Sequence, residues 1–414
     1  MSGRRVAVVG AGIIGTTCAL VLQTAGFRVT LFDPEPPGRG ASYGNAGSLS
    51  AGGVVPMALP GMLKQVPRWL FDSQGPLSVR WRHLPRAAPW LARWILASRW
   101  DRVERASDGL APLVKPSVDL YRALLPGDQA AALIRQTGQL NVSRNSAAGP
   151  GEAPVERLRR RHGVRVEMLD ENELRQLEPA LAPAYRRGVF LPDSGLATDP
   201  LRLTQTLADL FAAAGGTLRR SAVDGFEMRD GVVGAVRAGG AAHAVDTVVI
   251  AAGIHSRSFA RRLGDRVPLE SERGYHVEVE SPEVRIDRPI SDLDRKYFVS
   301  PIGDRLRFAG TVEIAGLAAP PDYRRAHVLG RLGRTLLPGL AGVEDKAVWM
   351  GHRPSTPDSL PVIDRASKVA NAVYAFGHGH LGLTAAPATA DLVLALVRGK
   401  GEAADLAPYR VGRF

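Results

Sequence analysis

A glycine-rich turn near the N-terminus has the residue types and spacing of a phosphate-binding loop. Its sequence is Gly10-Ala11-Gly12-Ile13-Ile14-Gly15. Gly10 suits a tight turn, Gly12 lets the backbone approach a pyrophosphate, and Gly15 lets a helix pack closely on a strand. The positive end of that helix would then meet the phosphate charge. The spacing therefore predicts a site for an adenine dinucleotide.

The elements around this turn form a complete βαβ unit. A β-branched run at 6–9 precedes the turn, a helical pattern covers 14–25, and a second strand covers 28–33. Asp33 ends the second strand, where its carboxylate can accept hydrogen bonds from the adenosine ribose. A glycine motif alone would be weak evidence in a chain with 45 glycines. Strand, helix, strand and terminal acid together are much more specific.

A second small-residue stretch, 38–53, is dense in Gly, Ser, Ala and Asn. A plain NAD-binding fold would normally continue into another helix here, so the stretch favours a larger cofactor threaded past it. A merely flexible loop would have the same composition and stays the alternative. The candidate cofactor contacts in this stretch are Ser42, Asn45, Ala46 and Gly47.

Near the C-terminus a strand again leads through a glycine-rich turn into a helix, as at the first loop. The apolar run 373–376 leads into the turn and then into a helix that continues to about 396. Backbone amides and a positive helix end again point at one place. FAD offers two negative targets, its pyrophosphate and its reduced isoalloxazine, whereas NAD lacks the second. The candidate flavin contacts in the turn are Gly379, His380, Leu381, Gly382 and Leu383.

Arg353 is the candidate for substrate binding. It lies in the segment 351–358, which is too rich in Gly and Pro for a helix interior. A guanidinium can grip a carboxylate with two parallel hydrogen bonds, which orients the substrate as well as binding it. Arginine is usually a surface residue, so this assignment depends on the flanking motif.

Length and strand patterns predict two domains. A chain of 414 residues exceeds the size at which a single core keeps growing. Strand patterns at 217–250 return the chain to the nucleotide sheet at Gly253, and 269–308 alternates as an antiparallel sheet would. We expect an α/β fold, with a Rossmann-type FAD-binding domain and a second α+β substrate domain built on an antiparallel sheet. The expected FAD-binding domain covers 1–85, 190–267 and 345–414, and the substrate domain covers 86–189 and 268–344.

Composition narrows the class and the compartment. The chain is 45% hydrophobic and 23% charged, as ordinary globular proteins are. Its net charge is +12, but the arginines are scattered, which favours a solvated surface over a nucleic-acid site. The single cysteine, Cys18, cannot form an internal disulfide, and no signal-peptide pattern is seen, so we expect a cytoplasmic protein. We assign no metal site.

The stretch 66–100 is rich in Trp, Arg and Pro, and five of the six tryptophans lie in it. Trp90, Leu91, Trp94 and Ile95 share a helical face with arginines nearby. Such a helix could lie in a membrane interface, giving peripheral contact with the inner face of the membrane. It could equally pack on its own domain. No uninterrupted apolar run approaches the roughly 20 residues that span a bilayer.

Taken in order, these motifs resemble those of the D-amino-acid oxidase and glycine oxidase superfamily. The resemblance covers nearly the whole chain and is greatest to bacterial D-amino-acid dehydrogenases, including those acting on D-proline or D-hydroxyproline. The segments 351–361 and 377–384 are its most specific parts.

The resemblance implies roles for the cofactor residues. Asp33 matches the ribose-binding acid, the backbone of Val223 matches the position that meets adenine, and the turn 379–383 matches the one beside the flavin. Members with covalent flavin use a cysteine near the C-terminal motif, which this chain lacks. The resemblance therefore implies non-covalent FAD.

It also implies the reaction. Arg353 matches the arginine that binds the substrate carboxylate, and Tyr275 is the candidate for a pocket tyrosine, with His276 and His352 behind it. Hydride would pass from Cα of a small D-amino acid to flavin N5, giving an imine and then a 2-oxo acid. A quinone or another acceptor would take the electrons. The alternatives are an oxygen-using oxidase of glycine, sarcosine or D-proline/hydroxyproline, and a non-catalytic basic nucleotide-binding protein.

Overall fold

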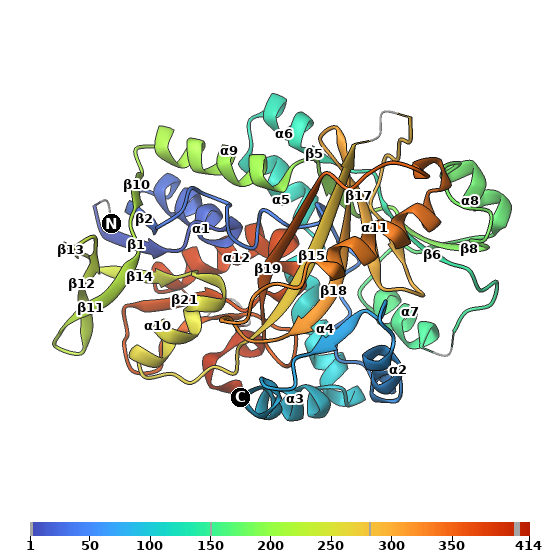
Figure 1. Ribbon diagram of the computed structural model, residues 1–414. Helices are drawn as coiled ribbons and strands as arrows, with labels where there is room; N and C mark the ends of the chain where they lie inside the picture. Colours follow the sequence, from blue (N-terminus) through green and yellow to red (C-terminus); the bar gives the residue numbers. More distant parts are fainter. Residues whose placement is uncertain (1–2, 150, 281–282, 401–405) are drawn as a thin grey trace. The chain divides into compact units, whose positions relative to one another are not determined.

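The computed structural model describes residues 3–149, 151–280, 283–400 and 406–414, and the chain forms two compact units (Figure 1). Unit 1 is Met1–Tyr43, Leu201–Glu270 and Arg353–Phe414, and unit 2 is Gly44–Pro200 and Ser271–His352. The segment 44–85, expected with the nucleotide-binding domain, groups with unit 2. It does so because β4 (Leu77–Val79) pairs with β18 (Arg305–Ile314) of that unit.

Unit 1 is built on a six-stranded sheet in the order β10-β2-β1-β14-β21-β20. All neighbouring pairs are parallel except β20 with β21. Central strands that are covered on both faces are rich in Val and Ile, which explains the nearly continuous apolar runs. The strands are β1 (Arg5–Val9), β2 (Arg28–Asp33), β10 (Thr217–Arg220), β14 (Thr247–Ile250), β20 (Val362–Arg365) and β21 (Ala372–Phe376).

Helices and a small sheet cover this parallel sheet. α1 (Ile13–Thr24) packs against α12 (Gly382–Val397). The antiparallel sheet of β11 (Val223–Arg229), β12 (Val232–Ala238) and β13 (Ala241–Ala244) shares a buried core with Ala7, Val9 and Ile250. The remaining helices of unit 1 are α9 (Pro200–Ala213), whose first residue belongs to unit 2, and α10 (Ser256–Arg262).

The last part of the strand pattern expected at 217–250 forms two strands that belong to different sheets. β13 ends at Ala244 and pairs with β12, whereas β14 begins at Thr247 and pairs with β1. Asp246 marks the break, because its carboxylate accepts a hydrogen bond from the backbone N–H of Arg5 at 2.7 Å. The chain therefore passes from the small antiparallel sheet to the parallel sheet at Asp246.

Among the described residues, only the stretch Gly379–Val397, 19 residues long, is long and apolar enough to cross a membrane. Its most apolar window is 61% buried. Because α12 forms most of this stretch and packs against α1 in unit 1, a place in the protein core accounts for its apolar composition.

Unit 2 contains a nine-stranded mixed sheet in the order β19-β15-β18-β17-β16-β6-β8-β7, with β4 added beside β18. Most pairs are antiparallel, as expected, but β16–β6 and β18–β4 are parallel. The other strands of this sheet are β6 (Gln139–Ser143), β7 (Glu167–Leu169), β8 (Arg187–Leu191), β15 (Glu270–Glu280), β16 (Ile290–Asp292), β17 (Tyr297–Ile302) and β19 (Ala347–Ser355).

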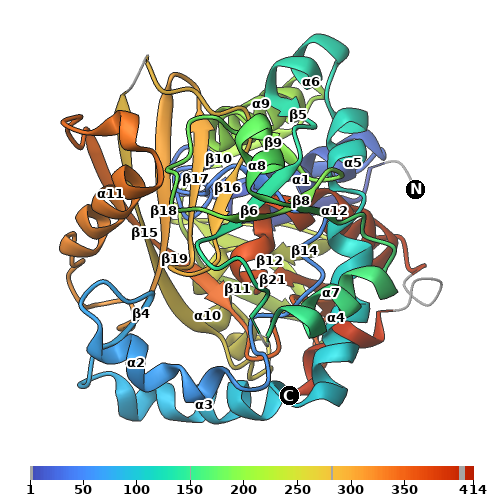
Figure 2. The ribbon, with the colours of Figure 1, turned by 90° about the vertical axis from the view of Figure 1, so that its right-hand side faces the viewer.

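One face of this sheet packs against α11 (Arg324–Leu336), which lies beside β15 and β18 (Figure 2). Tyr275 and Val277 on β15 belong to the core beneath it. Successive residues of a strand point to opposite faces, so His276 and Glu278 lie on the face away from α11. The other helices of unit 2 are α2 (Val66–Phe71), α3 (Leu84–Ala97), α4 (Trp100–Val114), α5 (Ser117–Leu124), α6 (Gly127–Leu133), α7 (Glu152–Arg161) and α8 (Glu171–Leu177). A short antiparallel sheet joins β3 (Ser48–Leu49), β9 (Gly195–Ala197) and β5 (Ile134–Arg135).

Candidate active site

The N-terminal loop is packed so closely that two of its glycines cannot be replaced. Gly10 has a φ of +106°, and a Cβ there would lie 2.5 Å from the carbonyl oxygen of Ala251. A Cβ on Gly15 would lie 1.8 Å from the carbonyl oxygen of Gly10. Ala251 follows β14 directly, so the returning strand forms one wall of the loop. The backbone at this place is free of side-chain bulk, as a pyrophosphate requires.

Two polar side chains organise the same loop. Asp33, at the end of β2, accepts a hydrogen bond from the backbone N–H of Ala11 at 2.7 Å. Ser42 Oγ accepts from the backbone N–H of Ile13, the first residue of α1, at 2.9 Å. A hydroxyl that accepts here can still donate its own hydrogen. Ser42 therefore places an O–H donor at the positive end of α1.

The C-terminal turn lies against the end of β19. Ser355 and His378 form an isolated antiparallel bridge. Gly377 and Gly379 have φ values of +87° and +53°, and a Cβ on Gly377 would lie 2.9 Å from Cγ2 of Thr356. α12 then begins at Gly382. As at the first loop, glycines here leave the backbone next to a helix N-terminus uncovered by side chains.

Arg353 lies close to this turn. Burial and the positive charge of Arg353 together lower the pKa of His380 to about 3. Burial also lowers the pKa of His378 to about 3, and its Nε2 lies 3.0 Å from Oγ1 of Thr389. Both imidazoles are therefore neutral near pH 7, and Arg353 carries the positive charge beside the turn.

Trp349 was not singled out from the sequence. Residues two apart on a strand share a face, so Trp349 and Gly351 of β19 share a face with Arg353. The indole lies across Gly351, where a Cβ would come within 1.9 Å of its Cη2. The period-2 spacing along β19 was the available signal, but the Gly- and Pro-rich composition of the segment obscured the strand.

In unit 2, Trp349 is held by a cluster that includes part of the 38–53 stretch. His276 stacks on it with ring centroids 5.1 Å apart and an interplanar angle of 19°. A Cβ on Gly44 would come within 1.8 Å of the indole Cζ3. Burial and the positive charge of Arg307 lower the pKa of His276 to about 3, so this ring is neutral.

The same cluster fixes the backbone at Asn45. Arg307 donates through Nη1 to the carbonyl oxygen of Asn45 at 2.6 Å and through Nε to Glu278 Oε1 at 2.9 Å. The backbone N–H of Gly47 donates to Asn45 Oδ1 at 2.8 Å. Gly47 has a φ of +74°, and a Cβ there would lie 2.7 Å from the carbonyl oxygen of Ala197. Asn45, Ala46 and Gly47 thus belong to unit 2, whereas Ser42 belongs to unit 1.

Tyr275 is placed differently from the expected pocket tyrosine. Its ring is buried in the core beneath α11, on the opposite face of β15 from His276. Its hydroxyl donates to Glu313 Oε2 at 2.6 Å and accepts from the backbone N–H of Asp322 at 3.0 Å. Burial and the bond to Glu313 raise the pKa of Tyr275 to about 12. Both hydrogen bonds of the hydroxyl are thus made to protein groups, and Tyr275 takes no part in the proposal below.

The remaining candidate residues occupy two regions. His352 Nδ1 lies 2.8 Å from Oγ of Ser271 in unit 2. In unit 1, Val223 begins β11, and Gly253 follows β14 with a φ of +55°. The backbone N–H of Leu381 donates to the carbonyl oxygen of His378 at 2.9 Å, and Leu383 is buried in the first turn of α12.

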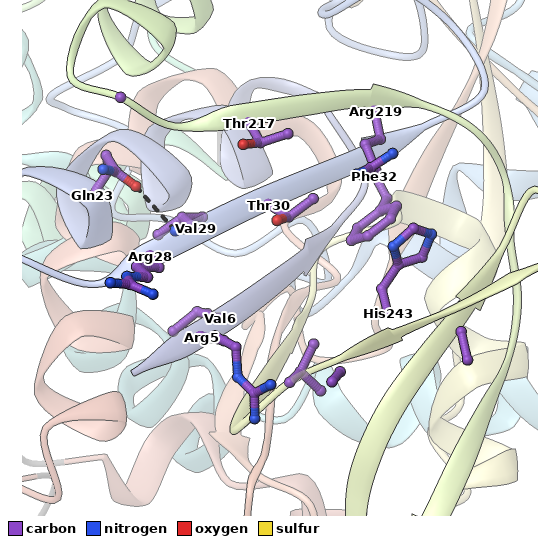
Figure 3. Close-up of a pocket in the computed structure, with 14 residues that line it drawn as sticks. Arg5, Val6, Gln23, Arg28, Val29, Thr30, Phe32, Thr217, Arg219 and His243 are labelled. Carbon is purple, nitrogen blue, oxygen red and sulfur yellow. Dashed lines mark hydrogen bonds between the residues drawn. The ribbon is translucent and has the colours of Figure 1, made fainter. Parts of the chain in front are cut away.

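A surface cavity of about 540 Å³ lies elsewhere in unit 1 (Figure 3). Arg5, Arg28, Arg219 and His243 are among its lining residues. Arg5 and Arg28 begin β1 and β2, whereas Gly10 follows the end of β1. The guanidinium of Arg5 is paired with Asp246 at 2.7 Å. The lining follows β2 from Arg28 to Phe32, whereas ligands of open α/β sheets bind at the carboxyl ends of the strands, and we assign no ligand to this cavity.

The described residues include no group of three or more His, Cys, Asp or Glu side chains able to hold a metal ion. Cys18 is buried in α1, and burial raises the pKa of its thiol above the usual range.

Comparisons with known proteins agree with this geometry. A family model described as FAD dependent oxidoreductase matches residues 5–396. A D-amino-acid oxidase of Bradyrhizobium diazoefficiens is 40% identical over 419 residues, covering 100% of this chain and 99% of that protein. A D-amino acid dehydrogenase of Xanthobacter autotrophicus is 30% identical over 423 residues, covering 99% of each. The crystal structure of glycine oxidase from Geobacillus kaustophilus has the same fold, with a TM-score of 0.75, 23% identity and full coverage of both chains.

Proposed function

Because the chain belongs to the family of FAD-dependent oxidoreductases, we propose that it oxidises a small D-amino acid and passes the electrons to a quinone-type acceptor. The substrate would lose a hydride from Cα and become an imine, which water converts to a 2-oxo acid and ammonia. The full-length relatives named D-amino-acid oxidase and D-amino acid dehydrogenase support this substrate class. The expected fold and the expected cofactor family are both confirmed.

The residues of unit 1 fit FAD at two places. The backbone at Gly10 and Gly15, which no side chain covers, would hold the pyrophosphate together with Ser42. Asp33, beside the loop, would hold the ribose. The turn Gly379–Leu381 and the start of α12 would face the isoalloxazine, where negative charge develops on reduction. When bound, FAD supplies the hydride acceptor.

Binding is proposed to be non-covalent. Cys18, the chain's one cysteine, is buried inside α1 and is far in sequence from the C-terminal turn. Tight packing and hydrogen bonds would therefore hold the cofactor without a bond to sulfur.

The observation that carries the proposal is the bridge between Ser355 and His378, which joins the strand that bears Arg353 to the turn that bears His380. The chain thereby brings a fixed positive charge to the turn that would face the flavin. A carboxylate held there by the two parallel N–H donors of a guanidinium has one orientation, so its Cα is presented in one direction. Because His380 is neutral, it does not compete for the carboxylate. Orientation and charge, rather than a strong base, are the contribution of the protein.

The electron acceptor is proposed from a surface feature of unit 2. The relative at 40% identity is named an oxidase and the one at 30% a dehydrogenase. We favour a quinone-type acceptor, with the enzyme in the cytoplasm and in peripheral contact with the inner face of the membrane, because of the exposed apolar and basic surface described below. If hydrogen peroxide forms in air in step with substrate consumption, the acceptor is oxygen instead.

The decisive experiment is anaerobic reduction of the purified yellow protein. Flavin absorbance should bleach with D-amino acids from a panel of D- and L-enantiomers that also includes glycine, sarcosine and proline. Arg353→Ala should retain flavin but lose about a hundredfold in kcat/KM, the effect expected from removing charge-assisted hydrogen bonds. Arg398→Ala, at an exposed arginine that follows the C-terminal end of α12, is the matched control. Failure to bleach with every amino acid, or full activity of Arg353→Ala, would contradict the proposal.

A further inference from the structure

We propose that unit 2 carries a docking surface for an anionic lipid bilayer, formed by the exposed sides of α2, β4 and α3. We call it the α2–α3 surface. It rests on the proposed function and deepens it, because it names the residues that would make the proposed peripheral contact with a membrane. Both ribbon views place α2 and α3 along one edge of the unit (Figures 1 and 2).

The helical face that the sequence suggested for membrane contact is a core face. Trp90 is buried in a cluster with Ala87 and Ile314, and Leu91 and Trp94 pack against that cluster. α3 therefore uses its tryptophans to pack on β4 and β18. Of the two alternatives that the sequence left open for this face, packing on its own domain is the one observed, so the opposite side of the helix is the one to consider for a membrane.

The outward side of α3 is also apolar. Its exposed residues include Pro85, Ala88, Pro89, Ala92 and Leu96, which follow one another at spacings of three, one, three and four residues, as residues on one face of a helix do. A helix that only covers the protein surface normally presents polar residues outward. α3 instead has apolar residues on both sides, which is typical of a helix lying between a protein core and a lipid surface.

Two large apolar side chains beside α2 and β4 are also exposed. Phe71, the last residue of α2, is 91% exposed, and Trp81, two residues after β4, is 70% exposed. α2 has no buried residue at all. Phe and Trp are the side chains that insert at the boundary between headgroups and acyl chains, and contiguous exposed patches of this kind mark interaction sites.

The charge of the segment identifies the partner. Residues 64–99 contain seven lysines and arginines and one acid, an excess of six positive charges, which is half the net charge of +12 of the whole chain. Arg80 is paired with Glu313, and the single acid, Asp72, is paired with Arg295. Arg82 and Arg86 are exposed and have no carboxylate partner among the described residues. Long basic side chains can keep their charge at the headgroups while their stems cover apolar surface.

The charge of the α2–α3 surface also argues against binding of a second copy of this chain. Two α2–α3 surfaces face to face would bring together two sets of unpaired arginines, which repel each other. An anionic bilayer supplies both an apolar interior for Phe71 and Trp81 and negative headgroups for Arg82, Arg86 and Arg93. The apolar and basic residues of the α2–α3 surface thus match the acyl chains and the headgroups of an anionic bilayer.

The test is flotation of the full-length, flavin-loaded protein with lipid vesicles. Vesicles of phosphatidylcholine alone are compared with vesicles in which half the lipid is phosphatidylglycerol. We expect selective binding to the anionic vesicles. The triple variant Arg82→Gln, Arg86→Gln and Arg93→Gln should bind about a hundredfold more weakly, since each arginine near such a surface contributes about fivefold. Phe71→Ser with Trp81→Ser should weaken binding about tenfold, because two exposed apolar anchors are lost.

Matched variants elsewhere on the chain separate this surface from general stickiness. Met228→Ser with Leu317→Ser removes two hydrophobic side chains that are 49% and 47% exposed. Arg261→Gln, Arg331→Gln and Arg410→Gln remove the same charge from exposed arginines outside the surface. These controls should bind vesicles as the wild type does. Equal losses in the controls, or no binding by the wild type, would overturn the proposal.

Two further readouts complete the test. Anaerobic flavin bleaching by a D-amino acid should be unchanged in every variant, so that failure of lipid binding and failure of the proposed activity are seen separately. Light scattering of the free protein tests self-association. A dimer that Phe71→Ser with Trp81→Ser dissociates would overturn the proposal in favour of contact between two copies.

Discussion

Ser355 and His378 form an isolated antiparallel β-bridge that ties the end of β19 to the turn before α12. This bridge brings together the two motifs near the C-terminus of the sequence, because Arg353 lies two residues before Ser355 and His380 two residues after His378. A Cβ on Gly379 would lie 3.3 Å from Oγ of Ser355, so the approach is close. The candidate carboxylate-binding residue and the candidate flavin-facing turn are thus parts of one local structure in unit 1.

Gly15→Ala should greatly reduce flavin binding. The new Cβ would lie 1.8 Å from the carbonyl oxygen of Gly10, so the loop must move. Overpacking of this kind costs about 1–3 kcal/mol of stability. The ratio of flavin to protein absorbance and the Tm measure the two effects. Gly40→Ala is the matched control, because no atom lies within 4 Å of its Cβ position. Normal flavin content in Gly15→Ala would show that the loop does not hold the cofactor.

Acid should destabilise the protein through its buried histidines. Burial lowers the folded-state pKa of His378 to about 3, below the unfolded value of about 6.5. Between these values the unfolded chain binds the proton more tightly, so the stabilising contribution is complete above pH 6.5 and is lost as the pH falls towards 3. Each group contributes up to about 1.4 kcal/mol per pH unit in that window.

The pH dependence can be assigned with His378→Asn. Denaturant unfolding from pH 7 to pH 4 should show a shallower loss of stability with acid in the variant than in the wild type. His243→Asn is the control, since that histidine lies near the surface of unit 1 and is only partly buried. Identical pH slopes in wild type and His378→Asn would refute the assignment.

Tyr275→Phe should lower stability and leave the reaction intact. The hydroxyl that it removes donates to Glu313, which is buried, and accepts from the backbone N–H of Asp322, two residues before α11. Leaving these groups unpaired costs about 2 kcal/mol, visible as a lower Tm. Tyr323→Phe is the control, because that ring packs edge-on against Tyr275 but is 41% exposed. A fall in kcat/KM at unchanged Tm would restore Tyr275 to the substrate pocket.

Trp349→Ala should lower the stability of unit 2. The indole stacks on His276 with ring centroids 5.1 Å apart and lies across Gly351. Removing this packed aromatic side chain should cost about 2 kcal/mol, visible as a lower Tm. His276→Gln removes only the stacked partner and should cost less. An unchanged Tm in Trp349→Ala would show that the indole does not hold this cluster together.

Short-range patterns in the sequence determined a good deal of the fold. The strand expected at 28–33 is β2, and the helix expected at 14–25 is α1 to within a residue at each end. These elements follow from local periodicity and from glycines that permit particular backbone angles, which are properties of neighbouring residues. Arg353 was selected in the same way, from the Gly- and Pro-rich segment around it.

The sequence by itself also determined the family and its cofactor, because closely packed glycine loops tolerate few other residues. Only the tertiary structure decided which face each residue serves. Tyr275 and His276 are neighbours on β15, yet α11 covers one face and so buries the tyrosine. Trp90 and Leu96 share α3, yet packing on β4 and β18 turns the tryptophan inward and leaves the leucine exposed. Periodicity tells that two faces differ, but contacts between distant segments decide which face is covered.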